Sequence, residues 1–211
     1  MDGTLIASTE ADYQAWQRLL AEYGVGLSFD DYFPLLGIRS IDLVKMKLNL
    51  TGPAADKALE KKMQYFREVV AERGVEQIPF ALRLIQELRR YSIRLALATS
   101  SRRQKTELIM SHTGLLEYFE VIVTGEEVVH GKPSPDIFLK AAEKLDLLPT
   151  ECLVVEDAAS GVQAAKVAGM KCVAITTTHE RSSLEKADII IESFEYLNVA
   201  ELGAALSRNL S

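Results

Sequence analysis

The sequence contains little cysteine and few aromatic residues. Only two of its 211 residues are cysteines, Cys152 and Cys172, and the aromatic residues make up 7%. A chain of this length can bury a core without cross-links, and each cysteine opens a short apolar run. We therefore expect two reduced, buried thiols and no disulfide. No spacing of cysteines resembles a zinc site.

The sequence also lacks long hydrophobic runs and an excess of basic residues. No apolar run approaches the roughly 20 residues that span a bilayer, and the N-terminus lacks the basic and then apolar order of a secretory signal. With 24 basic and 30 acidic side chains the net charge is −6, which offers no footprint for nucleic acid or an anionic membrane surface. We therefore expect a cytoplasmic protein, monomeric or homodimeric, with neither nucleic-acid nor membrane partners.

From residue 78 onward, short aliphatic runs alternate with longer helix-like segments. The runs are apolar throughout, as expected for strands that helices cover on both faces. They lie at residues 93–99, 119–124, 153–155, 171–176 and 187–191. Between them, Ser134-Pro135-Asp136 has the composition of a helix start, and Gly169 that of a helix end. The pattern predicts an α/β fold with a doubly wound, mainly parallel sheet, a Rossmann-like core.

The region from about residue 8 to residue 77 shows no convincing strand. Apolar residues recur there at helical spacing, at Trp16, Leu19, Leu20 and Tyr23 and again at Leu43, Met46 and Leu50. Residues 53–72 are predicted to form one long helix that begins at a proline and ends before Gly74. We therefore predict a core of residues 1–8 and 78–211 and an inserted helical cap of residues 9–77. Such an insertion would lie over the carboxyl edge of the sheet as a lid, since ligands bind there in α/β folds.

Polar groups stand where several of these strands end. The chain opens with the turn-like Asp2-Gly3-Thr4-Leu5, although no strand comes before it. The other groups are Thr99-Ser100-Ser101 after one strand, Gly131-Lys132-Pro133-Ser134-Pro135 before a helix, and Glu156-Asp157 after another strand. All four segments would meet at one edge of a parallel sheet, where they offer the charges that a phosphate and Mg²⁺ require.

In this order and spacing the motifs resemble the haloacid dehalogenase superfamily, over essentially the whole chain. The resemblance is to the subgroup with a helical cap, which contains β-phosphoglucomutase and the phosphoglycolate and sugar-phosphate phosphatases. The segments that carry it are Asp2-Gly3-Thr4-Leu5, Leu95-Ala96-Leu97-Ala98-Thr99-Ser100-Ser101, Gly131-Lys132-Pro133-Ser134-Pro135-Asp136 and Val154-Val155-Glu156-Asp157-Ala158-Ala159-Ser160-Gly161-Val162.

The resemblance implies a role for each of these positions in phosphoryl transfer. Lys132 would supply fixed positive charge, and the Thr99 hydroxyl and the Ser100 amide would bind the transferring phosphoryl group. Glu156 and Asp157 would hold Mg²⁺, directly or through water.

Two further residues have roles implied by the resemblance. Asp2 would act as general acid and base through its side chain and ligate the metal through its backbone carbonyl. Arg39 would clamp a substrate phosphate or the distal end of the substrate.

The sequence departs from the family pattern at one position. Relatives have an aspartate two positions before the residue that matches Asp2, and this aspartate is the nucleophile that becomes an aspartyl phosphate. That position would precede Met1, so we expect a sequence cut inside its first motif, without its first strand and poorly active as written. Ala7, where relatives often have an aspartate, is a smaller departure.

We therefore predict a Mg²⁺-dependent hydrolase of a small phosphorylated metabolite, a sugar phosphate or phosphoglycolate. One alternative is a hexose-phosphate mutase, although Asp12 stands where that relative has a histidine. Another is a non-catalytic phosphate-binding protein. The three histidines are interpreted as solvated or incidental, Trp16 as cap packing, and Lys62 as part of a charged helix face that could point into the cleft.

Overall fold

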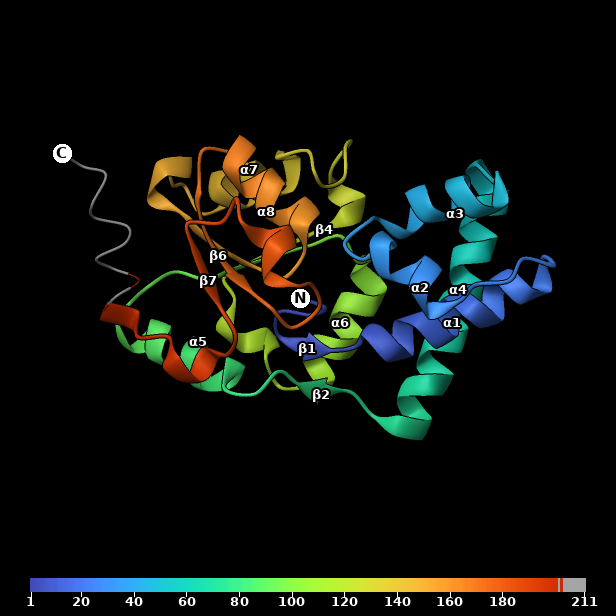
Figure 1. Cartoon of the computed structure of the whole chain (residues 1–211), viewed down its shortest axis with the longest axis horizontal. Coiled ribbons are helices and arrows are strands. Elements are labelled where there is room, and N and C mark those ends of the chain that lie inside the picture. The colour runs from blue at the N-terminus through green and yellow to red at the C-terminus, as the bar shows by residue number, and fades with distance from the viewer. Residues whose placement is uncertain (201, 203–211) are drawn as a thin grey trace.

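The computed structural model describes residues 1–200 and 202 and divides them into an α/β core and a helical bundle (Figure 1). The strands are β1 (Ile6–Ala7), β2 (Glu76–Gln77), β3 (Ala96–Thr99), β4 (Val121–Thr124), β5 (Leu153–Glu156), β6 (Lys171–Ile175) and β7 (Ile189–Ile191). The bundle contains α1 (Thr9–Glu22), α2 (Phe29–Tyr32), α3 (Ser40–Leu48) and α4 (Gly52–Arg73). The core helices are α5 (Ala81–Arg90), α6 (Arg103–His112), α7 (Asp136–Lys144) and α8 (Ala159–Val167).

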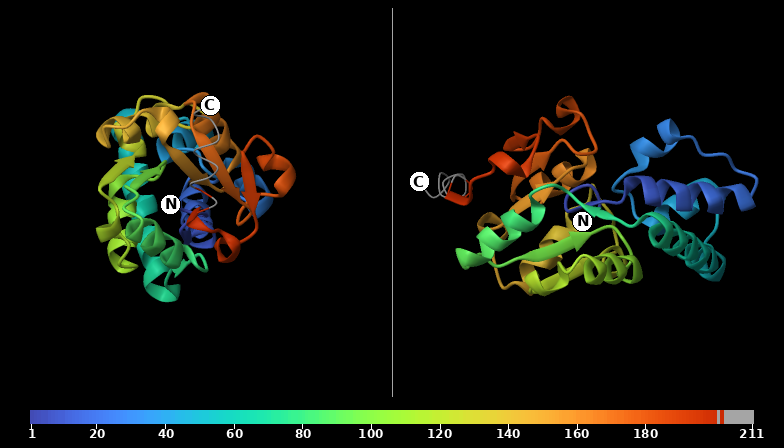
Figure 2. Two further views of the ribbon diagram at one scale, coloured as in Figure 1. Left: turned by 90° about the vertical axis from the view of Figure 1, so that its left-hand side faces the viewer. Right: turned by 90° about the horizontal axis from the view of Figure 1, so that it is seen from below.

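The core strands pair in parallel in two groups. β3 pairs with β4, and β5, β6 and β7 pair in that order. The N-terminal turn lies between the two groups (Figure 2, left). Its residues contact both sides, because Met1 packs in one cluster with Leu97 of β3 while Leu5 also packs against the cluster that contains Val173 and Ile175 of β6. The predicted α/β fold with a parallel sheet is confirmed.

All five predicted strands form, with shorter bounds at some ends. The strand predicted to begin at Ile93 begins at Ala96, because the Ile93 N–H closes the turn after α5 by donating to the Leu88 carbonyl. The predicted long helix is α4, which ends before Gly74 as expected. Gly74 has a φ of 73°, a conformation that glycine adopts without strain.

The expectation of no strand between about residues 8 and 77 is wrong for the last two residues of that range. Glu76 and Gln77 form β2, which pairs antiparallel with β1 in the register Ile6↔Gln77 and Ala7↔Glu76. A strand of two residues is too short to produce a periodic signal. The two chain segments that connect the core to the bundle are therefore hydrogen-bonded to each other.

The bundle buries its own apolar cluster between α1, α3 and α4. Trp16, Leu19 and Leu20 of α1 are almost fully buried in it. Two residues of the predicted apolar stripes are instead exposed, Tyr23 by 47% and Met46 by 58%. α1 ends at Glu22, so Tyr23 caps the helix and lies beyond its packed face.

A second cluster joins the bundle to the core. Phe66 of α4 is fully buried among Ile109 and Met110 of α6 and Ala15 of α1. Figures 1 and 2 show the bundle lying beside the core on the side where α6 lies. This contact fixes the position of the bundle relative to β3, since Leu97 belongs to the same cluster.

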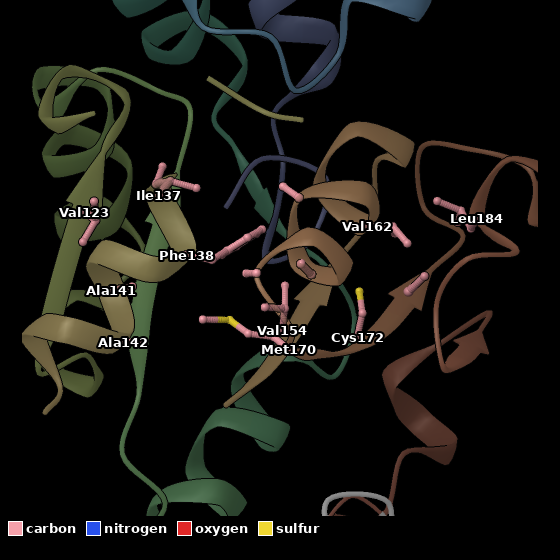
Figure 3. Close-up of a cluster of buried hydrophobic side chains, with 14 residues drawn as sticks. Val123, Ile137, Phe138, Ala141, Ala142, Val154, Val162, Met170, Cys172 and Leu184 are labelled. Carbon is pink, nitrogen blue, oxygen red and sulfur yellow. The ribbon is translucent and has the colours of Figure 1, made fainter. Parts of the chain in front are cut away.

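A third cluster fills the core between the strands and helices α7 and α8. Figure 3 shows Phe138 of α7, Val154 of β5, Cys172 of β6 and Val162 of α8 in it. The two cysteines are free thiols, as predicted, and Cys172 is buried whereas Cys152 is half-buried. Burial raises the pKa of Cys172 to about 12, so this thiol stays protonated at neutral pH.

Among the described helices, none combines the length and the apolar character that a bilayer crossing requires.

Replacement of Phe66 by alanine should destabilise the protein by about 3–5 kcal/mol, because a buried aromatic ring is lost and a cavity remains. Urea unfolding followed by circular dichroism measures this loss. Tyr91→Ala is the matched control, since Tyr91 is 66% exposed and its loss should change stability by less than about 0.5 kcal/mol. Equal effects of the two substitutions would contradict the packing described above.

Candidate active site

One cavity between the core and the helical bundle is lined by every residue predicted for the site except Arg39. These residues are Asp2, Thr99, Ser100, Lys132, Glu156 and Asp157. Thr99 ends β3, Glu156 ends β5 and Lys132 lies in the loop before α7. The carboxyl ends of the parallel strands thus bring together groups that are far apart in the sequence.

The end of β3 offers hydroxyl and backbone groups to the cavity. Thr99 is buried, and its Oγ1 accepts a 3.2 Å hydrogen bond from the Ser101 N–H. In residues 1–200 and 202, the buried hydroxyl oxygens of Ser100 and Ser160 have no hydrogen-bond partner. A buried hydroxyl without a partner is unfavourable, so the Ser100 hydroxyl suits a polar ligand in the cavity.

Lys132 and Glu156 form a buried ion pair in the cavity wall. The distance from Lys132 Nζ to Glu156 Oε2 is 2.8 Å, and the ammonium lies 4.9 Å from the centre of the Phe138 ring. Burial alone would raise the pKa of Glu156, but the Lys132 ammonium, the N-terminal ammonium and the hydrogen bonds that Glu156 accepts together lower this pKa. Glu156 is therefore ionised at neutral pH.

Asp157 lies directly beside Glu156 and is equally buried. Its carboxylate accepts hydrogen bonds from Thr4 Oγ1 at 2.7 Å and from Thr178 Oγ1 at 2.5 Å. Burial and then the negative charge of Glu156 raise the pKa of Asp157 above its ordinary value. A cation bound between the two carboxylates would relieve this repulsion.

Two glycines make room for these carboxylates. A Cβ atom on Gly161 would lie 2.1 Å from Glu156 Cδ, and one on Gly3 would lie 2.0 Å from Asp157 Oδ2. Gly3 also has a φ of 70°, which other residues rarely adopt. The position of Glu156 thus depends on the absence of a side chain at residue 161, and that of Asp157 on the absence of a side chain at residue 3.

Glu156 and Asp157 are the two carboxylates in the cavity that could hold Mg²⁺. In the described part of the chain, no three His, Cys, Asp or Glu side chains are grouped as metal ligands. The Asp2 carboxylate has other partners and does not join Glu156 and Asp157. Because Mg²⁺ takes only one or two carboxylates and keeps several waters, Glu156 and Asp157 remain a suitable pair of ligands.

The Asp2 side chain belongs to a buried charge cluster that sequence reasoning missed. Lys105 Nζ lies 2.7 Å from Asp2 Oδ1 and 2.6 Å from Asp12 Oδ1, and Lys62 Nζ lies 2.5 Å from the same Asp12 atom. Tyr32 donates to the other Asp12 oxygen at 2.8 Å. The cluster of Asp2, Lys105, Asp12 and Lys62 therefore connects α6 in the core to α1 and α4 in the bundle.

Each charge in this cluster alters the pKa values of its neighbours. Burial alone would raise the pKa of Asp2, but Lys105 lowers it to about 2. Burial would likewise raise the pKa of Asp12, whereas Lys105 and Lys62 lower it well below its ordinary value. Two carboxylates raise the pKa of Lys105 against the effect of burial, while burial lowers the pKa of Lys62, which contacts one carboxylate.

One signal in the sequence points to Lys105. Arg102, Arg103 and Lys105 stand at the start of α6, where the helix dipole disfavours cations. Arg102 and Arg103 pair with Glu126 and Glu127 at the surface. Lys105 is buried and needs its own carboxylates, which lie in the distant segment around residues 2–12.

The expectation that Arg39 binds substrate is not supported, because its side chain lies outside the cavity. Its guanidinium pairs with Asp42 at 2.6 Å and donates from Nη1 to the carbonyls of Val128 and Val129, both at 2.9 Å. The side chain crosses the backbone at Gly131, where a Cβ atom would lie 2.8 Å from Arg39 Nε. Arg39 thus links the bundle to the loop that carries Lys132.

The structure also places three other residues interpreted from the sequence, Lys62, Trp16 and His179. Lys62 is not on a solvated face but buried, within 5.2 Å of the Trp16 ring centre. Trp16 is part of the bundle's packing and also lines the cavity. His179 is not incidental, because it hydrogen-bonds Thr178 and lies against Phe33.

Comparison with known proteins agrees with this arrangement. Residues 1–175 match the family model of haloacid dehalogenase-like hydrolases. The chain belongs to this family.

Validoxylamine A 7′-phosphate phosphatase of Streptomyces hygroscopicus subsp. limoneus is 30% identical to this haloacid dehalogenase-like hydrolase over 209 residues, 96% of this chain and 95% of the relative. Fructose-1-phosphate phosphatase of Escherichia coli is 30% identical over 177 residues, 82% and 92% of the two chains. The crystal structure of β-phosphoglucomutase from Clostridium difficile superposes with a TM-score of 0.87 at 22% identity, over 97% and 93% of the two chains. This last likeness shows the fold alone. The resemblance inferred from the motifs is confirmed.

Replacement of Asp12 by asparagine should destabilise this haloacid dehalogenase-like hydrolase by about 3–5 kcal/mol at pH 7, because it leaves the buried Lys62 without a carboxylate and Lys105 with Asp2 alone. The native pKa of Asp12 lies below its unfolded value, so its ionised form stabilises the fold above about pH 4 and this stabilisation is lost on acidification. The difference in the free energy of unfolding between wild type and variant should therefore become smaller as the pH falls from 4 towards 2. Urea unfolding at several pH values measures it, with the exposed Glu60→Gln as control. A difference independent of pH would contradict the assigned cluster.

Replacement of Gly161 by alanine should displace Glu156 and weaken Mg²⁺-dependent binding of inorganic phosphate at least about tenfold, while the protein stays folded. The added methyl group meets Glu156, although alanine favours the helix by roughly 0.5–1 kcal/mol over glycine. Calorimetric titration measures the binding. Gly26→Ala is the matched control, because a Cβ there has nothing within 4 Å. Unchanged binding by Gly161→Ala would contradict the position of Glu156 in the site.

Proposed function

We propose that this protein hydrolyses small phosphate monoesters with the help of Mg²⁺. The observation that carries the proposal is the meeting of Thr99, Ser100, Lys132, Glu156 and Asp157 at one cavity. Two relatives that match most of the chain are named validoxylamine A 7′-phosphate phosphatase and fructose-1-phosphate phosphatase, which supports the same reaction class.

The proposed roles follow from the groups that each residue offers. The Lys132 ammonium, the Thr99 hydroxyl and the Ser100 backbone N–H would surround the transferring phosphoryl group and balance its negative charge. Glu156 and Asp157 would hold Mg²⁺, which when bound neutralises charge on the phosphoryl oxygens. Ser8 and Ser101 both donate hydrogen bonds to the Asp2 carboxylate and would orient it. Because Lys105 keeps this carboxylate ionised, Asp2 would enter proton transfer as the base.

The resemblance to the family implies an aspartate as the nucleophile. The carboxylates of Asp2, Asp12, Glu156 and Asp157 line the cavity, and each has cationic or hydroxyl partners. We propose that the carboxylate of an aspartate two positions before Asp2, upstream of Met1, attacks the phosphorus to form the aspartyl phosphate. The bond from phosphorus to the ester oxygen breaks, and the leaving group takes up a proton and departs as an alcohol. Water then attacks the phosphorus, which releases phosphate and restores the carboxylate.

The helical bundle supports a lid function. We propose that residues 9–77 act as the cap over a core of residues 1–8 and 78–211. With the bundle in the position described, the cavity has a volume of about 80 Å³, well below the roughly 300–1,000 Å³ of sites for drug-sized ligands. This size supports a small substrate and the exclusion of water during transfer.

A hexose-phosphate mutase is the second candidate, because the chain shares its fold with β-phosphoglucomutase. Asp12 argues against it. A histidine at that position can exchange protons near neutral pH, whereas the Asp12 carboxylate is held by Lys62, Lys105 and Tyr32. Plain phosphate release, without interconversion of hexose 1- and 6-phosphates, would support the hydrolase. A non-catalytic phosphate-binding protein is the remaining alternative.

Hydrolysis of p-nitrophenyl phosphate tests the proposal, with the 211-residue chain compared to one extended upstream by its own codons. The extended protein should release p-nitrophenol only with Mg²⁺, and the 211-residue chain should be poorly active. In the extended protein, Lys132→Met should lower kcat by about 10²–10³, the loss typical for one group that stabilises developing charge. Lys57→Met on the exposed face of α4 is the control. An inactive extended protein that still binds inorganic phosphate would favour the binding protein over the enzyme.

A further inference from the structure

The wall that the bundle contributes to the cavity contains no cationic side chain. Residues 9–77 are all described, and none of those that line the cavity is lysine, arginine or histidine. Leu35, Leu36, Ile38 and Leu43 make much of this wall apolar. Asp12 is its one carboxylate. This wall faces the part of a substrate that lies beyond the phosphoryl group.

Lys105, the lysine that lines the cavity beside Asp12, already pairs with two carboxylates. Lys105 lies within 2.7 Å of Asp2 and 2.6 Å of Asp12, so two carboxylates share its charge. Lys62 Nζ lies 2.5 Å from Asp12 Oδ1, and Lys62 does not line the cavity. The two ammonium groups and the two carboxylates balance one another, and the cluster as a whole is neutral.

Lys132 and Arg39, two further cationic side chains near the cavity, have partners of their own. Lys132 pairs with Glu156 and lies at the phosphoryl end of the cavity. Arg39, the bundle's candidate for an anion clamp, donates to Asp42 and to the carbonyls of Val128 and Val129, outside the cavity. A second anionic group on a substrate would therefore be buried beside Asp12 without a counter-ion, which is strongly unfavourable.

We propose that the site selects phosphate monoesters whose leaving group is uncharged, hydroxyl-bearing and apolar on one face. This inference rests on the proposed function and narrows its substrate class. Hydroxyl groups can bond the polar atoms of Tyr32 and Ser40, and carbon-bound hydrogens can pack on the leucine side chains. Substrates with a carboxylate or a second phosphate beyond the reacting group are rejected. Phosphoglycolate, one candidate from the sequence, falls in the rejected group.

A matched pair of ligands tests the charge selection without depending on turnover. 2-Hydroxyethyl phosphate and 2-phosphoglycolate have similar size and differ in a CH₂OH or a carboxylate at the far end. In calorimetric titrations of the 211-residue chain with Mg²⁺ present, 2-hydroxyethyl phosphate should bind at least about tenfold more tightly. Inorganic phosphate, titrated in parallel, reports whether the phosphoryl end of the site is competent.

A pair of variants separates charge from shape. Leu36→Arg places a cation on the apolar wall and should shift the binding ratio about tenfold towards 2-phosphoglycolate. Leu36→Gln adds a polar side chain of intermediate length without charge and should leave the ratio near the wild-type value. Circular dichroism establishes that both variants are folded.

The outcomes distinguish the two levels of the proposal. If inorganic phosphate and both esters fail to bind, the proposed function is wrong. If inorganic phosphate binds but 2-phosphoglycolate binds as tightly as 2-hydroxyethyl phosphate, the proposed function stands and the charge selection is wrong. Equal shifts of the binding ratio in Leu36→Arg and Leu36→Gln would also overturn the charge selection, because the preference between the two esters would then depend on the shape of the wall.

Discussion

Two adjacent carboxylates in a buried position repel each other, and much of the site's structure accommodates this repulsion. Glu156 is held by the Lys132 ammonium, and Asp157 by the hydroxyls of Thr4 and Thr178. The two carboxylates occupy space that a side chain on Gly3 or Gly161 would fill. A fold that keeps two such charges together at the end of a strand is well suited to a divalent cation. The cation would offset the repulsion between the two carboxylates, which the protein alone offsets poorly.

The second determinant is the charge cluster that crosses from the core to the bundle. Lys105 of α6 binds a carboxylate on each side, Asp2 in the core and Asp12 in the bundle. Buried ion pairs contribute little net stability compared with apolar packing, but they tolerate few alternative arrangements. The apolar contact of Phe66 with α6 supplies the attraction between the two parts, and the cluster determines the orientation in which they meet.

The sequence predicts the fold and the part of the site that the core contributes better than the part that the bundle contributes. Strand positions follow from apolar runs, and the motifs around Thr99, Lys132 and Glu156 meet because parallel strands share one edge. Met46 and Tyr23 were wrongly expected to be buried, since helical spacing alone does not say where a packed face ends. The sequence does not indicate Lys105, because its partner Asp12 lies 93 positions away. It also does not indicate the position of Arg39, because two of its partners are the backbone carbonyls of Val128 and Val129, which no sequence pattern marks.

The pairing of β1 with β2 has a consequence for how such proteins diversify. The chain leaves the core at Ile6 and returns at Gln77 on the adjacent strand, so the inserted segment has neighbouring ends. An inserted segment with neighbouring ends can be lengthened, shortened or exchanged without disrupting the structure of the core. A chemical core of this kind can therefore keep one reaction while its insertion is replaced, and new specificities can arise without a new catalytic apparatus.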